Sequence, residues 1–233
     1  MARLDEYKKS AETLIDETAL LLNDPLCERW SRSRIKEALN DAVLDFCLRA
    51  QMIKEELNVR LREDVIEYDI KRRVEEDDGL RDYGFPTRFG FNGTDAGMWP
   101  VDLATIDLMG YQQSAGVTPH RWHLGGVSPG KVALFGVPAA DGESLPSEEG
   151  NMQVTYIAFP AYMDGEGDYP DAAIPVGNHQ AFPYGAAARL LDEGDAEDLR
   201  KAIAFDVTFH QGVLAAVSED YRSMTTYDDA RPA

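Results

Sequence analysis

The sequence has few cysteines and no long apolar run. Its two cysteines, Cys27 and Cys47, have neither the spacing of a metal site nor the density of a disulfide scaffold, so we expect reduced structural thiols. No segment approaches the roughly 18 apolar residues of a membrane span, and the opening residues contain no apolar run of signal-peptide length. We therefore expect a protein that does not cross a membrane and that folds in the cytoplasm.

Basic side chains are also scarce. The chain has 23 Lys and Arg against 42 Asp and Glu, for a net charge of −19. The excess belongs to the second part, because residues 1–73 hold 14 basic and 16 acidic side chains while the remaining 160 residues hold 9 and 26. Such acidity disfavours binding to DNA grooves or anionic membranes. It suits a conduit through which DNA slides without sticking, and a saline habitat would select the same composition.

The signatures of the common enzyme classes are missing. There is no Walker loop, no dinucleotide fingerprint after a strand, and no basic and aromatic interleaving typical of single-strand binders. Residues 126–130 (GVSPG) match the G-x-S-x-G pattern, but the segment that follows has the pattern of a strand rather than a helix, so a β-turn is favoured over a serine nucleophile. His120 and His123 flank Trp122 without a third metal ligand in the sequence. We therefore expect no catalytic residue, metal or cofactor.

Two further groupings have weak metal-binding character. Asp206 and His210 lie one helical turn apart and could pair or bind a metal, although solvated or interface residues are the commoner explanation. Residues 164–168 (DGEGD) resemble a calcium loop, but Pro175 stands where the twelfth-position glutamate is expected. We interpret this segment as a flexible acidic loop.

The clearest helix spans residues 30–51. Ser31 is its expected N-cap, and Trp30 can pack on Ile35 as a hydrophobic staple. Apolar side chains then recur at spacings of three and four, which predicts a half-buried helix. A helix over 4–23 precedes it and ends at residues 23–25 (NDP), and residues 52–61 are predicted to continue the helical layer.

The middle of the chain has the pattern of strands. Residues 65–71 alternate apolar and charged side chains, residues 74–92 are predicted to form a loop, and short apolar runs separated by turn residues follow. These runs cover residues 101–108, 121–124, 131–137 and 152–159. The pattern predicts antiparallel sheets in a small sandwich or barrel.

The last part is predicted to be helical. A short helix over 184–191 precedes Asp195, the expected cap of a long helix with two apolar stripes. One stripe is expected to pack on the 30–51 helix and the other on a β-layer or on another copy of the protein. Residues 225–233 are expected to form a polar tail.

The predicted fold class is α+β. An antiparallel helical bundle is built from the two ends of the chain, and an antiparallel β-sandwich or barrel-like region is inserted between them. The predicted divisions are 1–62 for the N-terminal helices, 63–182 for the β-region and 183–233 for the C-terminal helices and tail.

The order of these parts resembles the head-to-tail adaptor, or connector, proteins of tailed bacteriophages. Residues 21–24 (LLND), Trp30-Ser31 and residues 38–42 (ALNDA) are similar to the first helical hairpin of that family. Residues 131–138 (KVALFGVP) and 154–160 (VTYIAFP) resemble its paired strands that end in prolines, and Ile174-Pro175 with residues 180–191 resembles the approach to its terminal helix. Together these motifs span most of the chain.

The resemblance implies a structural virion protein rather than an enzyme. Family members dock as a ring, usually twelvefold, beneath the portal protein at the capsid vertex, present a surface to the tail or next neck protein, and surround the path of double-stranded DNA. The protein would be assembled in the host cytoplasm and would reside in the virion neck, with no membrane. The alternatives are another neck or tail component, such as a tail-completion or tail-tube-like protein, a small metal-dependent hydrolase that uses His120 and His123, and an acidic interaction protein of the host.

Three groups of residues are assigned roles on this hypothesis. Ring packing and subunit contacts are assigned to Leu199, Ile203, Phe205, Val207, Phe209, Val213, Leu214 and Tyr221. Anchoring to the portal is assigned to the tail residues Thr225, Thr226, Tyr227 and Arg231. An acidic face toward the channel or solvent is assigned to Glu75, Glu76, Asp77, Asp78, Asp164, Glu166 and Asp168.

Overall fold

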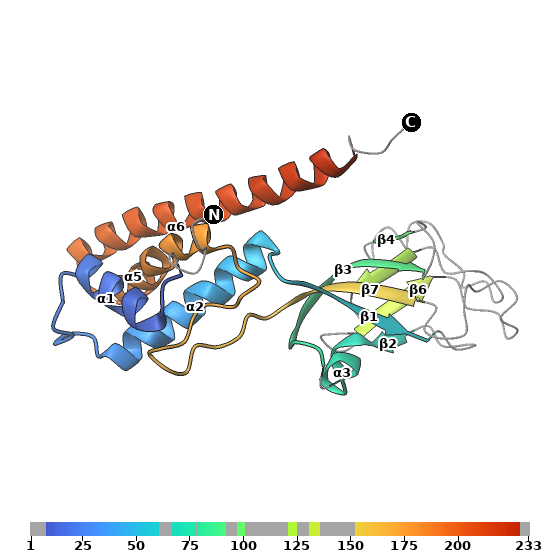
Figure 1. The fold of residues 1–233 in the computed structure, drawn as a ribbon, viewed down its shortest axis with the longest axis horizontal. Coiled ribbons are helices and arrows are strands. Elements are labelled where there is room, and N and C mark those ends of the chain that lie inside the picture. Colours follow the sequence, from blue (N-terminus) through green and yellow to red (C-terminus); the bar gives the residue numbers. More distant parts are fainter. Residues whose placement is uncertain are drawn as a thin grey trace, which may run out of the picture. The chain divides into compact units, whose positions relative to one another are not determined.

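The chain divides into two compact units. The computed structural model describes residues 8–60, 67–77, 79–91, 97–100, 121–124, 131–135 and 152–228. A helical unit comprises residues 1–53 and 159–233, and a sheet unit comprises residues 54–158 (Figure 1). The boundaries differ from the predicted divisions after residues 62 and 182. Residues 54–59 form a strand, and the segment after residue 158 packs in the helical unit, where Met163 exchanges two hydrogen bonds with the buried Asn40 side chain.

The first two helices begin at serine caps. Helix α1, Ala11–Leu21, starts where the Ser10 hydroxyl accepts the N–H of Thr13, and it ends just before Asn23, whose φ is 56°. Helix α2, Arg32–Ala50, starts where Ser31 accepts the N–H of Arg34 at 3.3 Å. The predicted helix over 30–51, its Ser31 cap and the predicted stop at residues 23–25 are confirmed. The helix predicted over 4–23 is confirmed only from Ala11 onward, because residues 8–10 are not helical and residues 4–7 lie outside the described residues.

The predicted helical continuation over residues 52–61 is wrong. Gln51 adopts a left-handed conformation with φ 51°, and its N–H bonds the Cys47 carbonyl, which ends α2. Strand β1, Lys54–Val59, follows and pairs antiparallel with β7, Met152–Ala158. The pairing partner lies almost a hundred residues later in the chain, so the local apolar pattern could not reveal it.

The C-terminal helices complete the helical unit. A 3₁₀-helix η3, Val176–Ala181, leads into α5, Phe182–Asp192, and then into α6, Ala196–Asp228. Asp195 caps α6 as predicted, because its Oδ1 accepts the N–H groups of Glu197 and Asp198. The predicted tail is shorter than expected, since residues 225–228 belong to α6.

Aromatic rings and small residues hold these helices together. Phe46 of α2 packs edge-on against Phe182 of α5 with ring centroids 5.3 Å apart, and against Phe209 of α6 at 6.0 Å. A Cβ placed on Gly185 would lie 2.6 Å from the Phe209 ring, so α5 and α6 approach closely only because that residue is glycine. The core of the helical unit is therefore shared by α2, α5 and α6, and α1 adds the fully buried Leu14 and Ile15.

The sheet unit contains one sheet of seven described strands. Besides β1 and β7, its elements are β2 (Glu67–Asp69), α3 (Ile70–Glu75), β3 (Tyr83–Phe91), β4 (Gly97–Pro100), β5 (Arg121–Leu124) and β6 (Lys131–Phe135). The strand order is β1-β7-β3-β4-β5-β6-β2, and the pairs are antiparallel except for β4 with β5. The protein is thus α+β, as predicted, with a largely antiparallel sheet.

Two predictions in this unit need correction. The strand predicted over 65–71 ends at Asp69, because the Asp69 carboxylate accepts the N–H of Arg72 and caps α3. The loop predicted over 74–92 contains strand β3, which pairs with β7 through Phe89 and Val154. The predicted strands over 121–124, 131–137 and 152–159 are confirmed as β5, β6 and β7, whereas residues 101–108 lie outside the described residues.

Candidate functional site

A line of exposed apolar side chains runs along α6. Its members, here named the α6 stripe, are Leu199, Ile203, Val207, Leu214 and Val217, and their exposed fractions range from 42% to 68%. They recur at helical spacing, so they lie on one side of the helix. Scattered exposed apolar residues are ordinary, but a line of them on one helix face, here interrupted at His210, is typical of a surface that meets a partner.

The other residues assigned to ring packing lie elsewhere. Phe209 and Val213 are buried, and Phe205 is half-buried with its ring 5.8 Å from that of Tyr184. Tyr221 and the tail residues Thr225, Thr226 and Tyr227 lie within α6, and their side chains are outside the described part, as is Arg231 altogether. Of the predicted contact residues whose side chains are described, Phe209 and Val213 thus belong to the core, Phe205 is half-buried, and the others belong to the exposed α6 stripe.

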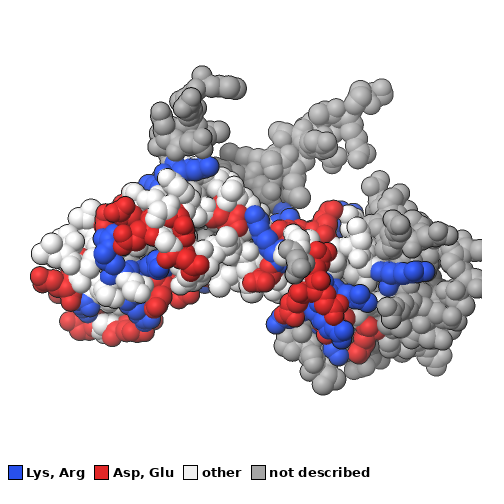
Figure 2. Space-filling model, turned by 60° about the horizontal axis from the view of Figure 1, so that its bottom comes forward, with Lys and Arg blue, Asp and Glu red and all other residues white. Residues whose placement is uncertain are grey.

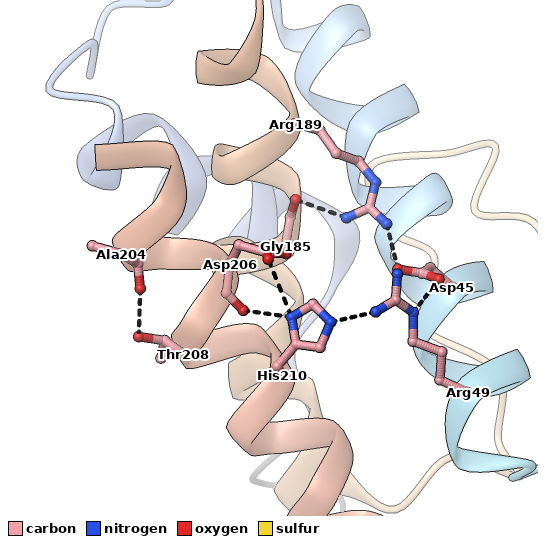
Figure 3. A network of polar contacts seen from close by, with 8 residues as sticks. All are labelled: Asp45, Arg49, Gly185, Arg189, Ala204, Asp206, Thr208 and His210. Atoms are coloured by element: carbon pink, nitrogen blue, oxygen red, sulfur yellow. Dashed lines mark hydrogen bonds and ion pairs between the residues drawn. The ribbon is translucent and has the colours of Figure 1, made fainter. Parts of the chain in front are cut away.

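A charged network connects three helices beside the stripe (Figure 3). Asp45 of α2 accepts hydrogen bonds from Arg49 of the same helix at 2.7 Å and from Arg189 of α5 at 2.8 Å. Arg189 also donates to the carbonyl of Gly185 at 2.9 Å. The network borders a hollow of about 380 Å³ whose other wall is formed by Ile203, Asp206 and Val207 of α6.

His210 joins α6 to this network. Its Nδ1 lies 2.9 Å from the backbone carbonyl oxygen of Asp206, which can only accept a hydrogen bond, and 3.3 Å from the Asp206 carboxylate. Its Nε2 faces the guanidinium of Arg49, which can only donate. Both ring nitrogens are therefore engaged within the chain, and the contact with Arg49 joins α6 to α2.

A groove opens on another side of α6. Its volume is about 690 Å³, and its walls come from α1, the η3 and α5 junction, and α6. We name it the α1–α6 groove, and its principal wall residues are Leu20, Leu21, Pro183, Tyr184, Gly212 and Ala215. Leu20 is 66% exposed, and the Lys9 and Glu17 side chains on the wall are paired at 2.7 Å. Local sequence patterns do not reveal this groove, because its walls come from distant segments.

The acidic loop at residues 164–168 has a structural role. The carbonyls of Asp168 and Glu166 accept the N–H groups of Ala11 and Glu12, which are the first of helix α1. Asp168 also closes the loop by accepting the N–H groups of Asp164 and Gly165. Carbonyl and carboxylate oxygens satisfy the free donors at a helix N-terminus and complement its dipole. All three predicted acidic residues of this loop are exposed.

The second predicted acidic segment lies at the end of α3. Glu75 and Glu76 are exposed and pair with Lys71 and Arg72 of the preceding turn, and Asp77 is exposed as well. Asp78 lies outside the described residues. Figure 2 shows acidic and basic side chains interspersed over the visible face of the described surface.

The ionisable side chain of η3, His179, is deeply buried. It is 2% exposed, packs against Phe182, and borders a pocket of about 840 Å³ together with Tyr169, Ile174 and Pro175. Within the described residues neither ring nitrogen has a hydrogen-bond partner, and each is itself almost inaccessible. Desolvation lowers the pKa of His179, the nearby carbonyl of Ile174 opposes this effect, and the charges of Lys9 and Lys8 add to it.

The remaining metal and nucleophile candidates gain no support. Among the residues that the structure describes, no group of three or more His, Cys, Asp or Glu side chains could hold a metal ion. His123 lies in β5, while His120 and residues 126–130 are outside the described part. No described helix is both long and apolar enough to cross a membrane.

Comparison with known proteins assigns this chain to no family. Neither a scan against protein-family models nor a search of curated proteins finds a match to this chain.

Proposed function

We propose that the protein is a structural head-to-tail adaptor of a tailed bacteriophage, which docks as a ring beneath the portal protein. The observation that carries the proposal is the α6 stripe. Five exposed apolar side chains on one helix, in a chain of net charge −19, form a surface that a neighbouring subunit can cover. Apolar side chains on this face would not stabilise the helix if the face stayed in contact with water.

The motifs that resemble the adaptor family support the proposal through their position. Residues 21–24 lie at the end of α1 and residues 38–42 lie in α2, so they form two consecutive helices as in the family's hairpin. Residues 182–191 lie in the helix that precedes α6. Residues 131–135 and 154–158 lie in β6 and β7, but among the described strands β6 pairs with β5 and β2 and β7 pairs with β1 and β3, so the resemblance to paired strands gains no support. On this proposal the helices form an antiparallel bundle as the ring body, and the sheet unit folds into a sandwich or barrel-like body.

The proposed partners are the portal protein and the tail or next neck protein. The exposed acidic side chains at residues 75–77 and 164–168 face the DNA channel or another solvated surface, where like charge keeps DNA from adhering. The end of α6 and the following residues anchor the ring, in the virion neck, after assembly in the host cytoplasm. The mainly helical unit disfavours a tail-tube-like protein, for which we expect mainly β structure.

The test is cosedimentation with the portal ring from the same genome, followed by electron microscopy of the pelleted complex. We expect a ring of copies under the portal, twelvefold as in the family. A folded protein that does not bind an intact portal contradicts the proposal and favours another tail component. A ring that buries both acidic segments contradicts the assignment of those segments.

Truncation tests the anchoring role. Removing residues 225–233 should weaken portal attachment and leave the circular dichroism spectrum and thermal unfolding of the rest of the chain unchanged. Equal attachment of the truncated and complete proteins would show that these residues do not anchor the ring.

Metal analysis of the purified protein separates the adaptor from the hydrolase alternative. On the adaptor hypothesis the protein contains no stoichiometric metal. Stoichiometric zinc or manganese would support the hydrolase alternative with His120 and His123 instead.

A further inference from the structure

The α6 stripe and the α1–α6 groove lie on different sides of the same helix. At 3.6 residues per turn, the stripe residues and the groove residues Thr208, Gln211 and Ala215 are centred about 120° apart around α6. The buried residues Phe209 and Ala216 occupy the remaining side. One unit therefore presents two different apolar surfaces, and neither can cover the other within one copy.

We propose that the α6 stripe of one copy of this chain binds in the α1–α6 groove of the next copy. The proposal rests on the proposed ring and names its contact surfaces. Because the two surfaces differ, the contact is heterologous, and repeated head-to-tail contacts produce a ring when the rotation closes. An amphipathic helix laid in a groove by residues spaced three and four apart is a recurrent mode of recognition.

Charge makes a second copy a suitable occupant of both surfaces. Two chains of net charge −19 repel each other, so contact is favoured where charges are already balanced. The charged pair on the groove wall is Lys9 with Glu17, and beside the stripe Asp45 is paired with both Arg49 and Arg189. Each surface is thus apolar with its neighbouring charges largely neutralised within the chain.

The available area favours the groove over a symmetric contact of stripe on stripe. The stripe extends from Leu199 to Val217, which is about 27 Å, and a helix face about 10 Å wide gives roughly 270 Å². The groove has walls from three segments, so it also contacts the flanks of a helix that lies in it, although its α6 wall extends only from Thr208 to Ala215, which is about 10 Å. Each contact is below the roughly 800 Å² per partner of a stable complex, so a single contact is weak and the two contacts of each ring subunit reinforce each other.

Two variants separate these arrangements. The stripe variant carries Ile203→Lys and Leu214→Lys, and the groove variant carries Leu20→Lys and Ala215→Lys. All four positions are exposed, and lysine is compatible with helices. The matched control carries Ala161→Lys and Ala172→Lys, at exposed positions outside both surfaces. Circular dichroism checks that each variant is folded.

The measurement is sedimentation over a concentration series up to about 1 mM. A contact with a dissociation constant of about 1 mM, which is a binding free energy of only about 4 kcal/mol, is detected in this range. We expect the wild type and the control to associate beyond the dimer, and each variant alone to associate at least tenfold more weakly. An equimolar mixture of the two variants should form heterodimers and stop there, because exactly one stripe and one groove remain intact.

Three outcomes would overturn the inference: a groove variant that associates like the wild type, a mixture that shows no recovery, or a wild type that stays monomeric at 1 mM. The experiment contains no portal protein. Failure of portal binding therefore leaves this contact standing, and failure of this contact leaves portal binding to be judged separately.

Discussion

Two sides of helix α6 have similar apolar residues and opposite surroundings. Phe209 is fully buried between α2 and α5, whereas Ile203, less than two turns earlier, is 60% exposed. The buried side faces glycine and alanine residues that let neighbouring helices approach, as at Gly185. On the exposed side, Ile203 and Val207 border the hollow of about 380 Å³ that they share with Asp45, Arg49 and Arg189, and both side chains stay more than half exposed. An apolar stripe on a helix therefore becomes part of the core only where another element packs closely against it.

The largest expected effect is on the buried side. Phe209→Ala should lower the free energy of unfolding by about 3–5 kcal/mol, because it leaves a cavity against Phe46 and removes an edge-on aromatic contact. Urea unfolding followed by circular dichroism measures the loss. A loss below about 1 kcal/mol would show that this side of α6 is not the core.

The close approach of α5 and α6 predicts the next effect. Gly185→Ala should destabilise the protein by about 1–3 kcal/mol, since its Cβ would lie 2.6 Å from Phe209 and 3.0 Å from the Cβ of Ala42. The matched control is Gly177→Ala, whose Cβ would meet nothing within 4 Å. Equal unfolding midpoints for the two variants would contradict the close packing.

Acid should lower the stability of the folded protein because His179 of η3 is buried. The imidazole has a lowered pKa in the folded protein and an ordinary pKa near 6.5 in the unfolded chain. Between these two values the unfolded chain binds more protons, so stability should fall as the pH drops below about 6.5, by at most about 1.4 kcal/mol per pH unit.

The substitution His179→Gln should reduce this dependence on pH. Urea unfolding at a series of pH values between 5 and 7 measures the slope for the variant and the wild type. His210→Gln, at a half-exposed position on α6, is the comparison. If His179→Gln leaves the slope of the wild type unchanged, burial of this imidazole does not control the acid response.

The charged network at the border of the two sides should contribute modestly. Asp45→Asn should cost about 1 kcal/mol, because the partly exposed carboxylate pairs with Arg49 and Arg189 in water-accessible surroundings. A double-mutant cycle with Arg189→Gln isolates the α2–α5 contribution. Additive effects of the two substitutions would mean that this ion pair contributes nothing.

The smallest effect on stability is expected on the exposed side. Ile203→Ser should change the free energy of unfolding by no more than about 0.5 kcal/mol while reducing self-association. Unfolding and sedimentation of the same preparation measure the two quantities. A large loss of stability in the monomer would show that Ile203 is covered within its own chain.

Much of the helical unit followed from local sequence. Ser31 and Asp195 were predicted as caps and act as caps, because a short side-chain oxygen beside a helix start needs only its own backbone. Strands β1 and β3 were missed, because each is defined by pairing with β7 far along the chain. The α1–α6 groove was missed for the same reason, since its walls come from three separated segments.

By itself, the sequence determined the α+β class, the caps and the two apolar sides of α6. These features depend on spacing along the chain, and spacing sets the angular position of a side chain on a helix. Only the tertiary structure decided that the side of α6 with Phe209 is buried and that with Ile203 is exposed, and that the acidic loop at residues 164–168 caps α1. Burial depends on which surfaces meet, and the helical period carries no information about the neighbour.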